Sequence, residues 1–335
     1  MHARARGAPQ PSPSQTEPAR TEPASSGRGG GCPTTPVGIL GTSAAPDAGV
    51  RFAVASAGVK PAPFEYHSPA TVAEALALLR EHGDDAKPLA GGQSLVPMLA
   101  LRLTRFAHLV DLNGVGALAG VELQPERLHI GSTTRQRVLE RDATVAAAVP
   151  LLARAAPHIG HFQIRNRGTV GGSLAHADPA SELPAVAVAL DAELVVGERT
   201  VAARDFFTGT WTTTLADDEL LTAAVFPVWS GDVRAAVHEV ARRNGDFALA
   251  GAAIQVSVDD GRVARAAIAL FGLDSTPVRA LDAEAALVAG ESLAAVAALA
   301  VRDVEPNDDI HATGAQRRRI GAAVVERALQ EVCGG

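Results

Sequence analysis

Two glycine-centred segments most constrain how this chain can fold. The first covers residues 87–95 and reads KPLAGGQSL, and the second covers residues 164–174 and reads IRNRGTVGGSL. Glycine reaches backbone conformations that a side chain forbids, so both segments predict turns whose backbone N–H groups point outward at close range. Concave arrangements of N–H groups hold phosphate oxygens. Two such segments in one chain therefore indicate one ligand with a pyrophosphate, held from two sides.

Better-known glycine motifs do not describe these segments. Neither spells GxGxxG between a strand and a helix, and residues 91–94 lack the Gly-Lys-Ser/Thr ending of a P-loop. Residues 92–96 do not give the GxSxG of a nucleophile elbow. A Gly-Gly pair on its own also marks ordinary turns, and the glycines alone leave that alternative open.

Composition excludes several classes of function. The net charge is −7 and no run of Lys or Arg stands out, which argues against a nucleic-acid partner. The two cysteines, Cys32 and Cys333, lie near opposite ends, whereas an iron–sulfur cluster needs about four thiolates. Scarce cysteine favours a reduced, cytoplasmic location. No apolar run approaches the roughly 18 residues of a membrane span.

The composition divides the chain into three parts. Residues 1–58 are rich in Pro, Ser, Gly, Thr and Ala and predict a disordered tail. Because bacterial GTG codons can start translation, we also consider that the native protein starts near Val59 and lacks this tail. Residues 59–231 predict a two-part domain, divided into about 59–117 and 118–231. Residues 232–335 predict a further domain.

The first part, residues 59–117, shows an α/β order. Strand signals at residues 64–67, 87–90 and 108–112 surround a helix that Ser68 and Pro69 would begin and Gly83 would end. Pro97 shows that the apolar stretch after the first glycine segment is not one long helix. A strand–helix–strand order in so short a stretch predicts a small α/β subdomain.

The rest of the chain alternates helices and strands. In residues 118–231 we expect strands at 128–130, 192–196 and 220–228, and helices at 134–139, 145–156 and 183–190. From residue 232 the pattern predicts three strands followed by helices, which is an α+β domain, with a hairpin turn at Asp259-Asp260-Gly261. The expected strands are 235–240, 249–258 and 263–271, and the expected helices are 281–288, 293–301 and 316–332.

Histidines raise the question of a metal site. His158, His161 and His176 lie near Asp178 in the sequence, but their spacing is loose and the first pair spans a glycine. Structural or exposed histidines are the stronger interpretation, so the sequence predicts no metal site. It also shows no general base or nucleophile that we would assign to catalysis.

Together these segments resemble a known family. Residues 87–95 look like the AGGxSL turn of the FAD-binding medium subunit of molybdenum hydroxylases, the xanthine dehydrogenase and aerobic carbon monoxide dehydrogenase family. Residues 164–184, reading IRNRGTVGGSLAHADPASELP, are similar to that family's second FAD loop. Residues 66–69, 242–248 and 271–280 resemble its further signatures. The resemblance covers roughly residues 60–333.

The resemblance implies a fold and a cofactor site. The fold would be a two-subdomain α/β FAD-binding domain (PCMH/VAO-type), followed by a C-terminal α+β domain with a three-stranded antiparallel sheet and helices. FAD would lie between the subdomains, with residues 159–164 near its isoalloxazine end. The residues that would contact it are Leu89, Ala90, Gly91, Gly92, Gln93, Ser94, Leu95, Thr169, Val170, Gly171, Gly172, Ser173, Asp178 and Glu182.

Individual roles follow from the same resemblance. Backbone N–H groups of both segments would wrap the pyrophosphate, and the hydroxyls of Ser94 and Ser173 would add bonds. Glu182 would face the adenosine ribose, and Asp178 is a second polar contact. One departure matters, because some relatives place a lysine near the flavin where this chain has His238-Glu239.

The implied function is electron transfer by FAD in a heterotrimeric complex, which would assemble as a dimer of heterotrimers. A large subunit would carry the molybdenum cofactor, and a small subunit would carry two [2Fe–2S] clusters. Substrate and terminal acceptor (oxygen, NAD or a quinone) are not indicated. A stand-alone FAD-dependent oxidoreductase of the same FAD fold is the alternative, and a homologue that has lost FAD is a third.

Overall fold

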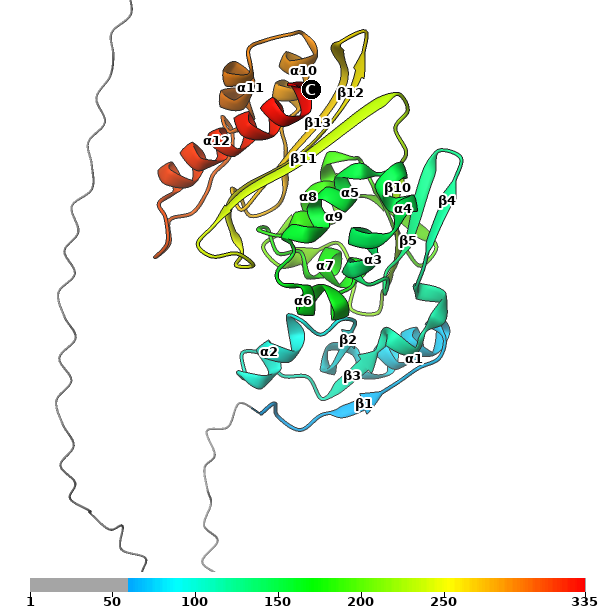
Figure 1. Ribbon diagram of the computed structural model, residues 1–335. Coiled ribbons are helices and arrows are strands. Elements are labelled where there is room, and N and C mark those ends of the chain that lie inside the picture. The colour runs from blue at the N-terminus through cyan, green and yellow to red at the C-terminus, as the bar shows by residue number, and fades with distance from the viewer. Residues whose placement is uncertain (1–59, 335) are drawn as a thin grey trace, which may run out of the picture. The chain divides into compact units, whose positions relative to one another are not determined.

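The computed structural model describes residues 60–334 (Figure 1). The tail predicted for residues 1–58 lies outside the described residues. Within them the chain forms three main sheets, and each sheet is built from its own stretch of sequence. The mixture of helices and strands, with parallel strands first and antiparallel strands last, is the predicted fold class.

The first sheet is parallel and has three strands. β1 (Glu65–His67), β2 (Ala86–Leu89) and β3 (His108–Asp111) lie in the order β1-β3-β2. Helix α1 (Val72–His82) connects the first two strands, and α2 (Leu95–Ala100) follows the first glycine segment. The α/β order predicted for this part is therefore confirmed.

The start of α1 differs from the prediction. Its N-cap is Thr71, whose hydroxyl accepts a hydrogen bond from the Glu74 N–H at 3.2 Å, so Ser68 and Pro69 precede the helix. A threonine with a carboxylate three residues later is a stronger N-terminal signal than a serine followed by proline. Gly83, with φ of +50°, ends the helix as predicted.

The second sheet is antiparallel and has five strands in the order β4-β5-β10-β6-β7. Its strands are β4 (Val121–Gln124), β5 (Arg127–Gly131), β6 (Glu193–Val196), β7 (Arg199–Ala202) and β10 (Leu221–Pro227). The edge strands β4 and β7 were not predicted. Each has four residues, none of them fully buried, so neither gives a long apolar pattern from which a strand can be predicted.

Short helices cover this sheet. They are α3 (Gln136–Arg141), α4 (Ala143–Ala148), α5 (Pro150–Ala155), α6 (Phe162–Arg167), α7 (Val170–His176), α8 (Glu182–Ala189) and α9 (Ala203–Phe206). Pro150 divides the single helix predicted for residues 145–156 into α4 and α5. A small ribbon of β8 (Phe207–Gly209) and β9 (Thr212–Thr213) follows α9.

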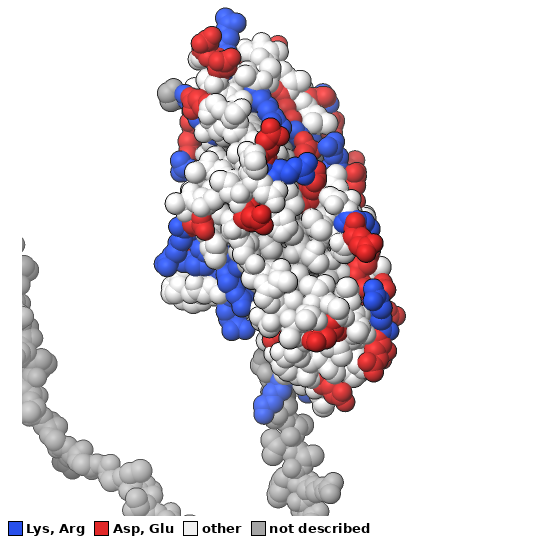
Figure 2. All heavy atoms as spheres, turned by 90° about the vertical axis from the view of Figure 1, so that its right-hand side faces the viewer, with Lys and Arg blue, Asp and Glu red and all other residues white. Residues whose placement is uncertain are grey.

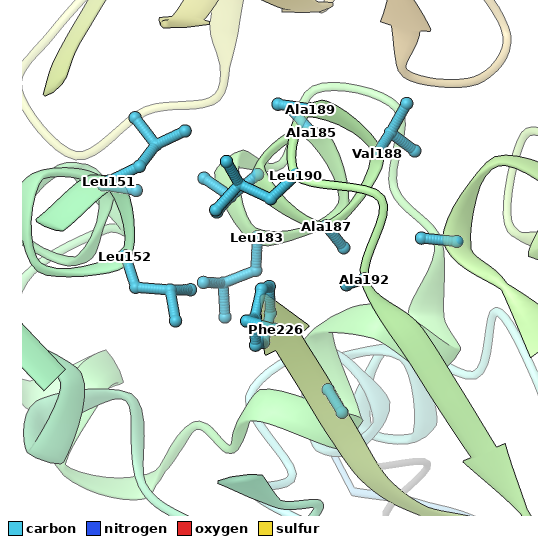
Figure 3. Packing of buried hydrophobic residues seen from close by; sticks show 14 of the residues in the cluster. Leu151, Leu152, Leu183, Ala185, Ala187, Val188, Ala189, Leu190, Ala192 and Phe226 are labelled. Carbon is cyan, nitrogen blue, oxygen red and sulfur yellow. The ribbon is translucent and has the colours of Figure 1, made fainter. Parts of the chain in front are cut away.

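Helix α8 is the centre of the largest apolar cluster. All of its eight residues are buried. Leu183 lies in α8, and Leu190 directly follows the helix. Both pack in the same cluster as Leu151 and Leu152 of α5 and Phe226 of β10 (Figure 3). A helix that is apolar all round can be stable only inside a core. The same helix therefore places Glu182, at its first position, within a buried environment.

The third sheet is antiparallel, as predicted. Its strands are β11 (Asp232–Ala241), β12 (Ala248–Asp259), β13 (Arg262–Phe271) and the two-residue β14 (Val278–Arg279). Positive φ angles at Asp260 and Gly261 confirm the predicted hairpin turn. The short β14, which adds to the three predicted strands, is too brief to show periodicity.

Both faces of the third sheet are covered. Alternate residues of β13 enter two different clusters: Ala267 and Ala269 face α5 and α8, whereas Ile268 and Leu270 face the C-terminal helices. Those helices are α10 (Leu281–Val288), α11 (Leu293–Ala300) and α12 (Gly314–Cys333), and Figure 1 shows them on one side of the sheet. The sheet thus joins the cofactor-binding part to the C-terminal helices.

The surface carries mixed charge. On the face shown in Figure 2, uncharged residues fill most of the area, and Lys, Arg, Asp and Glu are scattered among them. No helix within residues 60–334 combines the length and the apolar character needed to cross a membrane.

Candidate cofactor site

The first glycine segment presents unpaired backbone donors. It follows the C-terminal end of β2, and Gly92 has φ of +71°, a conformation that favours glycine. Within residues 60–334 the N–H groups of Gly91, Gly92, Gln93 and Ser94 donate to no acceptor. The only bond inside the turn runs from the Gln93 side-chain amide to the Gly91 carbonyl, at 3.0 Å. Successive free N–H groups of this kind suit anionic oxygens.

The second glycine segment is not the turn that we predicted. Gly171 and Gly172 lie in the first turn of α7, behind the N-cap Thr169. The Thr169 hydroxyl accepts the Gly172 N–H at 3.0 Å, and the Gly171 N–H donates to the Ser132 carbonyl at 2.7 Å. These donors already have acceptors inside the protein, so the unpaired N–H groups belong to the first segment.

Close packing explains why glycine stands at these helical positions. A Cβ atom on Gly171 would lie 2.4 Å from the Ser132 Cβ, and one on Gly172 would lie 2.7 Å from the Thr169 hydroxyl oxygen. Neither distance is tolerated between non-bonded heavy atoms. The sequence analysis correctly indicated that these two positions require glycine. The reason is the close approach of neighbouring atoms and not a positive φ angle.

The same closeness brings the two segments together. A Cβ atom on Gly91 would lie 2.5 Å from the Arg167 carbonyl oxygen and 2.7 Å from the Gly168 Cα. A Cβ atom on Gly172 would lie 3.3 Å from the Cβ of Ala90. Segments that are far apart in the sequence thus meet where only glycine fits, and the residues predicted to hold the two sides of one ligand become neighbours.

Asn113 and Arg135 hold this contact, and the sequence analysis did not single them out. The Asn113 amide donates to the Ala90 carbonyl at 2.8 Å and accepts from the Arg135 guanidinium at 2.7 Å. Arg135 also donates to the Arg167 carbonyl. One chain of hydrogen bonds therefore joins both segments. The available signal was the Asn113-Gly114 pair directly after a buried strand, which marks a turn at a sheet edge.

A cavity of about 340 Å³ adjoins this contact. Asn113 and Arg135 line it, together with Gly120, Thr134 and Asp142. The fourteen residues predicted to contact the cofactor lie outside its lining. The predicted cofactor surface is therefore the meeting place of the two segments and not this cavity.

Of the two predicted acidic contacts, Asp178 already has protein partners. Its carboxylate accepts hydrogen bonds from the Ala180 N–H at 2.9 Å and from the Trp211 indole N–H at 3.2 Å. The side chain is buried and therefore held in one orientation. Asp178 can bind a further hydroxyl only through an acceptor position that these two donors leave open.

Glu182 lies in a different environment. Burial, together with the nearby charges of Glu239 and Asp178, raises the pKa of its carboxyl group to about 8, although a backbone hydrogen bond and Arg165 oppose the shift. Near neutral pH this carboxyl group is therefore mostly protonated. A protonated carboxyl group both donates and accepts hydrogen bonds, which suits hydroxyl groups of a ligand.

Glu239 belongs to the His238-Glu239 pair at which the resemblance indicated a departure from the family. One carboxylate oxygen lies 3.5 Å from Nδ1 of His158, and the other is buried without a hydrogen-bond partner in the described part of the chain. Its neighbour His238 points elsewhere, with Nε2 2.8 Å from a carboxylate oxygen of Glu331 on α12. The acidic residue lies close enough to Glu182 for its charge to raise the pKa of that carboxyl group.

Arg165 fixes the segment that the resemblance places near the isoalloxazine ring. Its guanidinium donates to the carbonyls of Ile159 at 3.2 Å and Gly160 at 2.8 Å, and to the Glu140 carboxylate at 2.8 Å. The arginine is itself buried. In the adjoining helix α6, Phe162 remains 53% exposed and is free to contact a ligand.

The histidines considered in the sequence do not form one cluster. His158 faces Glu239, His161 lies against Gly245, and His176 stacks on Trp211 with ring centroids 6.4 Å apart. Within residues 60–334 a different set of three histidines comes together, His67, His82 and His108.

Comparison with known families agrees with this geometry. Residues 62–229 match the FAD binding domain in molybdopterin dehydrogenase, and residues 235–332 match the CO dehydrogenase flavoprotein C-terminal domain. The chain therefore belongs to the FAD-binding medium subunits of the molybdenum hydroxylase family. Its cofactor is FAD, and it is a subunit of an oxidoreductase.

Individual relatives are similar over nearly their whole length. The caffeine dehydrogenase subunit beta of Pseudomonas sp. (strain CBB1) is 39% identical over 280 residues, which cover 81% of this chain and 95% of the relative. The carbon monoxide dehydrogenase medium chain of Hydrogenophaga pseudoflava is 36% identical and covers 80% of this chain and 96% of its own length.

Solved structures show the same similarity. One of them is a carbon monoxide dehydrogenase from Hydrogenophaga pseudoflava that lacks the Mo-pyranopterin moiety of its molybdenum cofactor. It superposes with a TM-score of 0.79 at 38% identity, over 82% of this chain and 98% of the matched chain. A quinoline 2-oxidoreductase from Pseudomonas putida 86 gives a TM-score of 0.77 at 35% identity.

Proposed function

We propose that this chain transfers electrons within a molybdenum hydroxylase complex, receiving them from [2Fe–2S] clusters of a partner subunit and passing them through FAD to a terminal acceptor. The contact between the first glycine segment and the start of α7 carries this proposal, because it places the free N–H groups of residues 91–94, here called the cradle, next to the start of α7. The family to which the chain belongs supports FAD as the occupant.

The residues at this contact fit the cofactor. The free N–H groups of Gly91, Gly92, Gln93 and Ser94 would bind the pyrophosphate oxygens, and they neutralise negative charge without a basic cluster. The hydroxyls of Ser94 and Ser173 would add hydrogen bonds. Gly172 contributes mainly by letting α7 approach Ala90, whereas Gly171 lets the same helix approach Ser132.

The ribose and the isoalloxazine ring of FAD would contact different residues. Protonated Glu182 would exchange hydrogen bonds with ribose hydroxyls, and Asp178 would provide a second acceptor. Arg165 would hold residues 159–164 in place beside the isoalloxazine ring. Bound FAD would supply the chemistry of accepting electrons one at a time and passing them on in pairs. The protein groups bind, orient and shield it.

The remaining parts of the complex are also proposals. A large subunit would carry the molybdenum cofactor, a small subunit would carry the clusters, and two such heterotrimers would form a dimer. The relatives support partners in general, since several of their names describe subunits or medium chains. We retain the division at about residues 117 and 231 into two FAD subdomains and a C-terminal domain, and a cytoplasmic location, as predictions.

Purification of the tagged chain from its native host tests this function. We expect it to co-purify with a larger and a smaller chain, and the complex to contain FAD, molybdenum and iron. A yellow protein that is isolated alone and oxidises a small substrate without partners would instead establish the stand-alone FAD-dependent oxidoreductase.

A further inference from the structure

Three histidines that are far apart in the sequence meet beside the first sheet. His67 is the last residue of β1, His82 is the last residue of α1, and His108 is the first residue of β3. One ligand atom from each lies within 4.8 Å of the others, and all three side chains are half-buried. Their convergence depends on the crossover of α1, which brings its C-terminal end next to the sheet.

The distance between two of the histidine ring nitrogens is close to that in a metal site. Nε2 of His67 and Nδ1 of His108 are 3.0 Å apart. Two nitrogens bound to one tetrahedral zinc ion at about 2.0–2.1 Å lie roughly 3.3–3.4 Å apart. These two imidazoles therefore need to separate only slightly to admit an ion between them.

The third histidine must rotate to join them. The ring of His82 stacks on that of His108, with centroids 3.7 Å apart and planes 5° from parallel. His82 is half-buried at the end of a helix, and one of its ring nitrogens already lies within 4.8 Å of the ligand atoms of the other two histidines. A side-chain rotation can thus aim its ring nitrogen at the point shared by the other two.

We propose that His67, His82 and His108 bind one divalent transition-metal ion, with Zn²⁺ the best match. Neutral imidazole is a ligand that Zn²⁺ prefers, and three protein nitrogens leave a fourth tetrahedral position for water. The carboxylate of Glu65 lies 3.7 Å from Nδ1 of His108. It supplies negative charge near the ion and can either bind directly or orient a ligand from outside.

The site is separate from the FAD cradle. His108 pairs with Ala86 at the start of β2, whereas the cradle follows the other end of that strand. The four residues of β2 place these ends about 10 Å apart. A bound ion would connect β1, α1 and β3 and would stabilise this part of the fold without contacting the cofactor. The proposal therefore stands independently of the proposed electron-transfer function.

Zinc titration of the FAD-loaded protein tests the site. After dialysis against a chelator, calorimetry with Zn²⁺ at about pH 7.5 should show one ion bound per chain, and Co²⁺ should give the visible absorption of a tetrahedral site. His82→Gln and His108→Gln should each weaken binding at least tenfold. His129→Gln is the matched control, because it removes a half-buried histidine from a strand of the second sheet.

The cofactor provides a further readout. FAD content should stay unchanged in all three variants. Equal zinc binding by wild type and His82→Gln, or no binding by the wild type at micromolar concentration, would overturn the proposal. If His108→Gln fails to fold, the His82→Gln result decides, because that residue lies at a helix end.

Discussion

Burial gives Glu182 a protonation equilibrium unlike that of an exposed glutamate, and this affects stability. Its pKa rises from 4.5 to about 8 in the folded chain. Between these values the folded state binds a proton that the unfolded state has released. The free energy of unfolding should therefore fall as the pH rises through this window, by at most about 1.4 kcal/mol per pH unit.

Denaturant unfolding of the FAD-free chain between about pH 5 and pH 8 measures this effect. We expect the wild type to lose stability with rising pH and Glu182→Gln to show a smaller slope, since glutamine does not titrate. Glu81→Gln, at an exposed position of α1, should keep the wild-type slope. Equal slopes in wild type and Glu182→Gln would show that this carboxyl group does not titrate as described.

Glu239 offers a second variant at the same place. Its negative charge raises the pKa of Glu182, so Glu239→Gln should lower that pKa, and the loss of stability should end at a lower pH and be smaller in total. The same unfolding series measures the shift. An unchanged pH profile in Glu239→Gln would mean that the two carboxyl groups do not interact.

Among the helices and strands, α7 is one whose stability depends on its N-cap residue. Thr169→Val keeps the shape of the side chain but removes the acceptor of the Gly172 N–H, which should cost about 1 kcal/mol of stability. Ser292 caps α11 in the same way, through the Ala295 N–H. Ser292→Ala should therefore cost a similar amount and serve as the control.

The two cap variants should differ in FAD affinity. Of the two capped helices α7 and α11, only α7 touches the cradle, so Thr169→Val should raise the dissociation constant for FAD several-fold, whereas Ser292→Ala should leave it unchanged. Denaturant unfolding measures the free energy of unfolding, and flavin fluorescence titration measures the dissociation constant for FAD. If both variants bound FAD equally well, α7 would not contribute to the site.

Sequence patterns predicted the long elements well because those elements bury regular apolar faces. Strands β11 to β13 and helices α10 to α12 all appeared close to their observed positions. Edge strands such as β4 are short and largely exposed, so their apolar residues are too few to reveal them. The second Gly-Gly pair predicted a turn because glycine disfavours helices, but tertiary packing against Ser132 determined both the residue and the helix.

Across the whole molecule, contacts between distant segments could not be predicted from the sequence. The pairing of Asn113 with Arg135 and the meeting of His67, His82 and His108 depend on how separate strands and helices are arranged. The same holds for the third sheet, whose strands showed apolar patterns without revealing that α5 and α8 cover one face. The glycine segments were an exception, because the resemblance linked them before the structure did.

The FAD content of glycine variants tests the central claim most directly. Gly91→Ala places a methyl group against the Arg167 carbonyl and should separate the two segments, whereas Gly116→Ala meets no atom within 4 Å and serves as the control. We expect about one FAD per chain in wild type and Gly116→Ala, and at least a tenfold loss in Gly91→Ala and Gly172→Val, with circular dichroism showing that all remain folded. Full FAD content in both Gly91→Ala and Gly172→Val would contradict the account.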